Sequence, residues 1–374
     1  MSTLSVVEPG KLQYDHIIGT DGIGSGIVFS LKGDHTLGRN ESRMARLEPF
    51  HDYCKLHIVM HYVSILLGAN PAGRFRSYPI GRVGSDEPGT RLLEQMSQAG
   101  MCMGSVKKDP SPTLYSVCYQ YPDFSGGNIT TENSASSKVS PEDVDHFFRD
   151  FRKGKGDGIV LAVPEVPLET RMALLRKGRE RGYLNVASVL SSEVDEFNKQ
   201  GGLDATDLLA VNLYEACSIA DIEDDSDDSD RIISRSIETI TRSNPGLIML
   251  VTCGEEGSFC YQDGQLEQHA ALPAEARSTA GAGDAFLAGI IAGMCCGLPL
   301  LKGASRNDIT AKPLSSAVDL GTLLASLSVT SSDTIHPEGD AGCLLQYAAS
   351  KGLAFSDGFA KVFSQCLQQT PPRC

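Results

Sequence analysis

The feature that most constrains the fold is an alternation of short apolar runs with an amphipathic segment in the second half of the chain. The run 247–254 (LIMLVTCG) is apolar throughout and ends in a glycine, which is typical of a buried central strand. Leu168, Met172 and Leu175 recur on one face of 168–182, and Gly182 ends this helix. Further strands are predicted at 156–163, 183–190 and 206–212. This alternation predicts an α/β fold with a parallel-rich sheet, in which ligands bind at the carboxyl ends of the strands.

The region from about 105 to 137 has a different pattern. Residues 113–121 (TLYSVCYQY) alternate between apolar and polar, and a turn-rich polar tract follows. We expect short antiparallel strands there that form a lid. The acidic stretch Asp221–Asp230 and the Gly- and Pro-containing segment from Cys296 are predicted surface loops.

Composition narrows the class of protein. The 374 residues include 33 Lys and Arg against 47 Asp and Glu, a formal net charge of −14 that argues against a nucleic-acid partner. The eleven cysteines are scattered without a C-x-x-C pair, which favours reduced thiols. The N-terminus has no leader pattern and no apolar stretch is long enough for a membrane span. We therefore expect a cytoplasmic protein that does not associate with membranes.

The strongest chemical signal is the segment STAGAGDAFLAGIIAGM, residues 278–294. Its helical part carries an apolar stripe, so the helix begins near Gly281, Ala282, Gly283 and Asp284. Small residues leave the first N–H groups unobstructed, and the helix dipole adds positive potential, so this turn suits a phosphoryl group. Asp284 either stabilises the dipole or accepts a proton from an alcohol beside the anion-binding turn.

At this segment the sequence resembles the PfkB, or ribokinase-like, carbohydrate kinases. Residues 279–286 match the T-x-GAGD-x-F signature of that family closely. The resemblance implies Asp284 as the catalytic base, and Gly281, Ala282 and Gly283 as the anion hole. It also implies a three-layer α/β/α sandwich with a small β-sheet lid, ATP and Mg²⁺ as cofactors, and a homodimer.

Further matches lie at three strand ends. Asn212 and Glu215 resemble the family's N-x-x-E element, which implies that both organise Mg²⁺, Glu215 through water. Thr252, Gly254 and Gly257 resemble its T-x-G-x-x-G element, which implies contact with the nucleotide.

Asn185 lies in a segment, 184–187, similar to the family's L-N-P-A, although the proline is missing. The resemblance implies that Asn185 faces the nucleotide phosphates. Altogether it covers residues 15–337.

The substrate-binding pattern of the family is altered in the N-terminal half. Where the family has G-G-x-x-x-N, this chain has 55–62 (KLHIVMHY), with His57 and His61 spaced to share one helix face. We expect these two histidines, Asp21 in a glycine-rich tract, and Arg39 to contact the acceptor. The alternatives are core histidines, a flexible turn and ordinary surface charge.

The sequence thus predicts an ATP-dependent kinase of a sugar, a sugar derivative or a nucleoside. We expect a single domain over 1–374, with lid segments at about 20–55 and 105–137 and a C-terminal extension of the core at 338–374. One alternative is a nucleotide-binding regulatory protein of the same fold with altered catalysis. A dinucleotide-dependent oxidoreductase, suggested by GTDGIGSG at 19–26, lacks the helix that such a fingerprint requires directly after the glycines.

Overall fold

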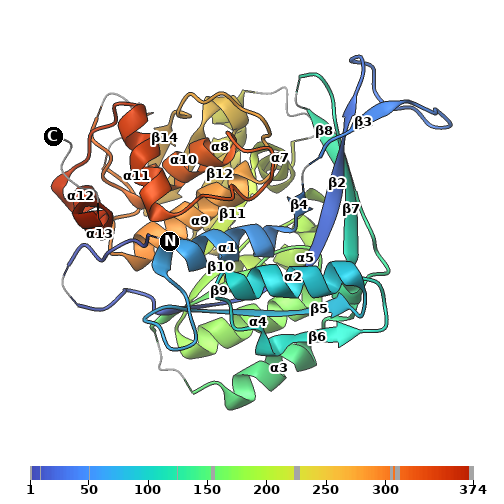
Figure 1. Ribbon diagram of the computed structural model, residues 1–374, viewed down its shortest axis with the longest axis horizontal. Coiled ribbons are helices and arrows are strands. Elements are labelled where there is room, and N and C mark those ends of the chain that lie inside the picture. Colours follow the sequence, from blue (N-terminus) through green and yellow to red (C-terminus); the bar gives the residue numbers. More distant parts are fainter. Residues whose placement is uncertain are drawn as a thin grey trace.

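A computed structural model describes residues 2–8, 10–49, 51–123, 125–152, 156–222, 228–303, 306–307 and 312–369. A large sheet is flanked by helices on both faces, and a second, smaller sheet stands beside it (Figure 1). The predicted three-layer α/β/α sandwich with a small β-sheet lid is confirmed. The centre of the predicted acidic loop, 223–227, and Cys374 lie outside the described residues.

The large sheet has a parallel centre. From one edge to the other its strands are β15 (Arg306–Asn307), β14 (Gln265–His269), β13 (Ser258–Gln262), β12 (Ile248–Thr252), β11 (Leu208–Asn212), β10 (Leu184–Ala187), β9 (Gly158–Ala162), β1 (His16–Thr20), β5 (Arg76–Gly84) and β6 (Val106–Asp109). All neighbours from β12 to β6 pair in parallel, whereas β13 is antiparallel to both β12 and β14. The carboxyl ends of β9, β10, β11 and β12 therefore meet at one edge of the sheet.

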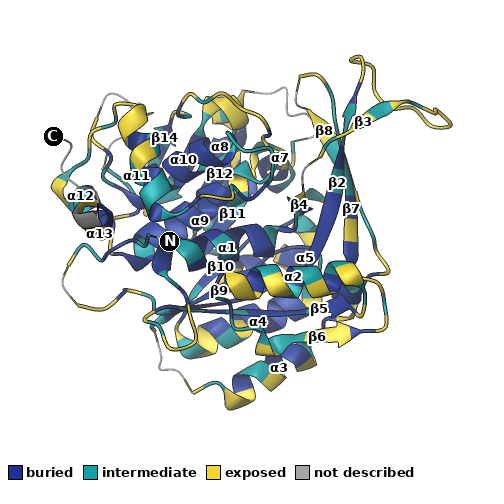
Figure 2. Ribbon diagram, in the orientation of Figure 1, coloured by how far each residue is buried: buried dark blue, intermediate teal, exposed yellow. Residues whose placement is uncertain are grey.

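Successive residues of the central strands enter different cores. Ile17 of β1 belongs to one buried cluster and Ile18 to the other, because side chains alternate between the faces of a strand. Every residue of β1 and β9 is buried, as expected for strands covered on both faces. Figure 2 shows the exposed residues, in yellow, mainly on the outer helices and loops. The predicted strands and the predicted helix of the second half are confirmed.

The helices divide between the two cores. One core receives α1 (Lys55–Leu67), α2 (Glu87–Gln98), α9 (Ala282–Cys295), α10 (Ala317–Ser328), α11 (Ala341–Ser350), α12 (Asp357–Val362) and α13 (Ser364–Gln369). The other receives α3 (Pro141–Asp150), α4 (Leu168–Arg181), α5 (Val194–Lys199), α6 (Gly202–Ala205), α7 (Leu213–Ala220) and α8 (Ser229–Ser243). Short 3₁₀ turns lie at η1 (Met103–Ser105), η2 (Ala135–Lys138), η3 (Ser191–Glu193) and η4 (Gly254–Glu256). No helix in the described ranges is both long and apolar enough to cross a membrane.

Close packing of α9 against α10 positions the start of α9. A Cβ atom at Gly289 would lie 2.6 Å from the Cα atom of Gly321, so only glycine permits this approach. The two helices can therefore approach each other closely at Gly289 and Gly321.

The smaller sheet combines two separate segments of the chain. It consists of β2 (Gly24–Leu31), β3 (Ala45–Leu47), β7 (Leu114–Gln120) and β8 (Gly126–Thr130) in the order β3-β2-β7-β8, with β4 (Asp52–Tyr53) paired to β2. Strands β2 and β7 are parallel and the other pairs are antiparallel. Strand β6, which lies within the second predicted lid segment, pairs with β5 in the large sheet instead.

The C-terminal helices are part of the main core. Phe359 and Val362 of α12 are buried in the same cluster as α9 and α10. The N-terminal segment lies beside them: the N–H of Ser5 donates to the carbonyl of Val362, 2.7 Å away (Figure 1). The two ends of the described chain therefore close one side of the sandwich together.

Candidate active site

Helix α9 begins at a glycine in the left-handed region. Gly281 has a φ of 77°, and a Cβ atom there would lie 3.0 Å from the carbonyl oxygen of Thr334. The first N–H groups of a helix have no partner one turn back and carry positive potential. Gly281 and Gly283 line a cavity of about 220 Å³, whereas the N–H of Ala282 donates to the carbonyl of Thr279 at 3.3 Å.

The cavity lies at the carboxyl ends of the central strands. The ends of β11 and β12 meet there with the first turns of α1 and α9. Its polar lining consists of Lys55, Ser188, Asn212, Glu215, Thr252 and Asp284. This is the position at which parallel α/β sheets bind ligands.

Asp284 lies in the first turn of α9 and is largely buried, with 17% of its side chain exposed. Burial raises the pKa of its carboxyl, the Lys55 ammonium lowers it, and the Asp52 carboxylate raises it; the net direction is upward. The Lys55 Nζ lies 3.7 Å from the Asp284 Oδ1 and donates to the Ser188 Oγ at 3.1 Å. A carboxylate with a raised pKa is a better proton acceptor than an exposed one.

Lys55 is surrounded by carboxylates. Burial alone would lower the pKa of its ammonium, but Asp284, Glu215, Asp21 and Glu165 act in the opposite direction, and the net direction is upward. The lysine is therefore held in its charged form and partly neutralises the acidic groups around it.

Asn212 and Glu215 cap the N-terminus of α7 reciprocally. The N–H of Glu215 donates to the Asn212 Oδ1 at 2.8 Å, and the N–H of Asn212 donates to the Glu215 Oε2 at 2.9 Å. Glu215 is buried, which raises the pKa of its carboxyl, while Lys55 lowers it. The capping fixes both side chains at the cavity wall.

Of the other predicted nucleotide-binding residues, the structure brings one to the cavity and leaves three outside its lining. Thr252, the last residue of β12, lines the cavity. Gly254 is the first residue of the 3₁₀ turn η4 and Gly257 follows its last residue; neither is part of the cavity lining. Asn185 is not brought to the cavity either: it is fully buried within β10, and its Nδ2 donates to the carbonyls of Leu175 and Ala205, both at 2.7 Å.

Two further carboxylates face Lys55 from the loops after β1 and β9. Asp21 is fully buried; its Oδ2 accepts the N–H of Leu56 at 3.0 Å, and its Oδ1 has no hydrogen-bond partner among the described residues. The Glu165 Oε2 also has no partner in the described part of the chain, and the residue has a positive φ of 77°. Burial, and then the Glu165 charge, raise the pKa of Asp21. The predicted residue Asp21 thus joins the group around Lys55.

Strand β4 of the lid adds Asp52. Its Oδ2 accepts from the Ser116 Oγ at 3.2 Å and from the Cys118 Sγ at 3.1 Å, both on β7. Burial raises the pKa of Asp52. The lid therefore brings a fixed acidic group towards Asp284 and Glu165, whose pKa values it raises.

The structure does not bring the other predicted acceptor residues to Asp284. His57 and His61 lie on α1 but line a different cavity, described below. Arg39 is exposed in the loop between β2 and β3 and lines neither cavity. The sequence pattern missed Lys55, Ser188, Asp52 and Glu165. For Lys55 a signal existed, because a lysine in the first turn of a helix opposes the helix dipole.

The chain is similar in sequence to known carbohydrate kinases. The model of the pfkB family carbohydrate kinases matches residues 65–340, well over half of the chain. A fructokinase from Klebsiella pneumoniae is 28% identical over 231 residues, which are 59% of this chain and 72% of that protein.

Two solved structures share the fold. Ribokinase from Cryptococcus neoformans var. grubii in complex with ADP has a TM-score of 0.67 at 16% identity and covers 89% of this chain and 99% of its own. Burkholderia thailandensis nucleoside kinase in complex with inosine has a TM-score of 0.62 at 15% identity and covers 90% and 99%. With a family match over most of its length and a fold shared with these kinases, the chain belongs to the pfkB family of carbohydrate kinases.

Proposed function

We propose that the protein transfers the γ-phosphoryl group of ATP to a hydroxyl of a sugar, a sugar derivative or a nucleoside, with Asp284 as the general base. The observation that carries this proposal is the position of the Asp284 carboxylate, in the first turn of α9 and inside the cavity at the strand ends. A proton acceptor and an anion-binding helix start thus share one turn.

In the proposed reaction, the acceptor hydroxyl gives its proton to the Asp284 carboxylate as its oxygen attacks the γ-phosphorus. The bond between that phosphorus and the oxygen that bridges it to the β-phosphate breaks, and ADP leaves with the bond's electron pair. Backbone N–H groups at Gly281 and Gly283 stabilise negative charge on the transferring group. Lys55 favours the ionised form of Asp284, because its ammonium opposes the rise that burial causes in the pKa of that carboxyl.

The side chains of Glu215 and Asn212 suit the binding of a hydrated magnesium ion. The described residues contain no group of three or more His, Cys, Asp or Glu side chains arranged to hold a metal. Mg²⁺ retains several waters and binds through one or two carboxylates and the substrate phosphates, so Glu215 beside Asn212 is sufficient. When bound, the ion would neutralise phosphate charge; Glu215 and Asn212 would orient its waters.

The acceptor side supports a polyhydroxylated substrate. Asp21 Oδ1 and Glu165 Oε2 are buried without a partner in the described chain, and carboxylate oxygens accept hydrogen bonds from hydroxyls. Lys55 donates from the same region. We therefore assign acceptor binding to Asp21, Glu165 and Lys55 in place of His57, His61 and Arg39.

We also propose a homodimer formed through the lid, in a cytoplasmic protein. Apolar side chains are exposed at and beside the small sheet, Met44 just before β3 at 86%, Leu47 on β3 at 55% and Ile129 on β8 at 66%, and these would be covered if two lids pair. No disulfide joins any of the ten cysteines in the described residues, in keeping with a reducing compartment.

The test is ADP release from Mg-ATP over a panel of fructose, ribose, sugar acids, sugar phosphates, adenosine and inosine. We expect acceptor-dependent release by the wild type and its loss in Asp284→Asn. The matched control is Asp195→Asn, an exposed aspartate of α5 that should not change the rate. ATP binding without release on any acceptor would instead favour the regulatory alternative.

A further inference from the structure

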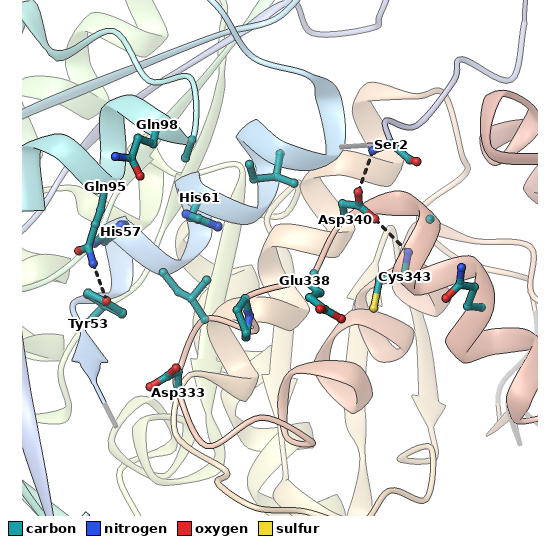
Figure 3. A pocket seen from close by; sticks show the side chains of 17 residues that line it. Ser2, Tyr53, His57, His61, Gln95, Gln98, Asp333, Glu338, Asp340 and Cys343 are labelled. Atoms are coloured by element: carbon teal, nitrogen blue, oxygen red, sulfur yellow. Dashed lines mark hydrogen bonds between the residues drawn. The ribbon is translucent and has the colours of Figure 1, made fainter. Parts of the chain in front are cut away.

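A second and larger cavity lies on another face of α1. It has a volume of about 640 Å³ and shares no lining residue with the 220 Å³ cavity of Asp284. Its walls include α1, the end of α2, the segment between α10 and α11, and the first half of α11 (Figure 3). Neither the phosphoryl transfer nor the acceptor binding proposed above uses it.

Two histidines of α1 form one wall of this cavity. His57 is 1% exposed, and the Nδ1 atoms of both His57 and His61 are buried without a hydrogen-bond partner in the described ranges. Burial lowers the pKa of His57 to about 3 and of His61 to about 4, so both rings are neutral at physiological pH. A neutral imidazole offers one donor and one acceptor, and a buried polar group without a partner is stabilised when a ligand supplies the missing hydrogen bond.

The same wall presents a row of aromatic rings. The centroids of Tyr53 and His57 are 4.7 Å apart, and those of His57 and His61 are 6.1 Å apart. Figure 3 shows these rings between α2, which carries Gln95 and Gln98, and the segment that carries Asp333 and Glu338. The planes of these two ring pairs are inclined by 62° and 53°, respectively. Such an aromatic wall beside amide groups suits a planar, hydrogen-bonding ligand.

The charged side chains that line this cavity are acidic and therefore disfavour an anionic ligand. It contains Asp333, Glu338 and Asp340, and no Lys or Arg is among its described residues. Asp340 accepts the N–H of Ser2 at 2.7 Å and the N–H of Cys343 at 3.0 Å, and Asp333 accepts the N–H of His51 at 2.9 Å. A phosphorylated or carboxylated ligand would meet three carboxylates and no cation.

From the unpartnered imidazoles, the aromatic wall and the acidic rim, we propose that this cavity binds an uncharged or protonated planar nitrogen heterocycle of nucleobase or nucleoside size. The cavity volume lies within the roughly 300–1,000 Å³ of small-molecule sites. The site is separate from the one that holds ATP and the acceptor.

Cys343 gives a direct readout, because this half-buried cysteine lines the cavity. The protein is saturated with Mg²⁺ and a non-hydrolysable ATP analogue, and the rate of iodoacetamide labelling of each cysteine is followed by peptide mass spectrometry. We expect adenosine and adenine to slow labelling of Cys343 at least fivefold, and AMP and ribose to leave it unchanged. Cys102, half-buried outside the lining, is the internal control.

A pair of variants tests whether a histidine of α1 is needed for the protection of Cys343 from labelling. His61→Leu removes the unpartnered ring nitrogen and should abolish protection by adenosine, whereas His146→Leu, at an exposed histidine of α3, should not. No protection by adenosine or adenine, equal protection by AMP or ribose, or undiminished protection in His61→Leu would each overturn the proposal. The selectivity of the wild type tests it even if His61→Leu fails to fold.

Discussion

In the active site proposed above, the residues assigned to the nucleotide and those assigned to the acceptor are positioned in different ways; we refer to them as the nucleotide side and the acceptor side. On the nucleotide side, Asn212 and Glu215 lie within four residues at the start of α7, and Gly281 to Asp284 form one turn at the start of α9. On the acceptor side, Asp21, Asp52, Lys55 and Glu165 come from separate loops, a lid strand and a helix start. Local backbone geometry therefore specifies the first side, whereas tertiary packing assembles the second.

The two sides also differ in charge balance. The acceptor side places several carboxylates around the single ammonium of Lys55, and each of these carboxylates has a raised pKa. The nucleotide side relies on helix N-termini and on the carboxylate of Glu215. Lys55 contacts both sides, because it lies 3.7 Å from Asp284 and is attracted to Glu215 and Asp21.

Apart from substitutions of the proposed base Asp284, Lys55→Met should reduce the catalytic rate most, because it leaves the surrounding carboxylates without their counter-charge. We expect kcat/KM for the acceptor to fall by about 10²–10³. The loss of the ammonium should also raise the pKa of Asp284 further, so the acidic limb of the pH–rate profile moves to higher pH. Steady-state rates from pH 4 to pH 9 measure both effects.

Lys177→Met on α4, a half-exposed lysine paired with Asp145, is the matched control and should leave rate and profile unchanged. A Lys55→Met enzyme with the wild-type rate and an unshifted limb would contradict the role of Lys55 as counter-charge.

Glu215→Gln tests the nucleotide side alone. Removal of the carboxylate charge should raise the Mg²⁺ concentration needed for half-maximal rate by about 10–100-fold, and leave the acceptor KM unchanged. The measurement is a magnesium titration at saturating acceptor. A changed acceptor KM with an unchanged magnesium requirement would show that Glu215 belongs to the other side.

Asp21→Asn and Glu165→Gln test the acceptor side alone. Each change weakens a charge-assisted hydrogen bond to a hydroxyl, so we expect the acceptor KM to rise about tenfold with an unchanged ATP KM. The two Michaelis constants are measured in crossed titrations. Equal increases in both constants would break the distinction between the two sides.

The lid should give the smallest effect. Met44→Glu together with Ile129→Glu places charge on the exposed apolar side chains, so the proposed homodimer should dissociate and the acceptor KM should rise about two- to threefold. Light scattering after size-exclusion chromatography measures the mass. Leu367→Glu, at an exposed leucine of α13, is the control. A wild-type monomer at micromolar concentration would refute the dimer.

The same contrast explains what the sequence could and could not predict. The parallel sheet and the start of α9 follow from apolar periodicity and from Gly281–Asp284, all of which are local. Glu165 depends on a left-handed backbone at a non-glycine residue, which no local pattern indicates. Asn185 resembles a nucleotide contact in sequence, yet its amide is used by the carbonyls of Leu175 and Ala205. His57 and His61 share a helix face as predicted, but that face borders the larger cavity.

The central claim is that the Asp284 carboxylate takes the proton of the acceptor. Single-turnover phosphoryl transfer by Asp284→Asn, with the affinity for a non-hydrolysable ATP analogue measured in parallel, tests it most directly. The account predicts analogue affinity within about threefold of wild type and a transfer rate lower by about 10²–10⁴. A transfer rate equal to that of wild type at saturating ATP and acceptor would contradict it.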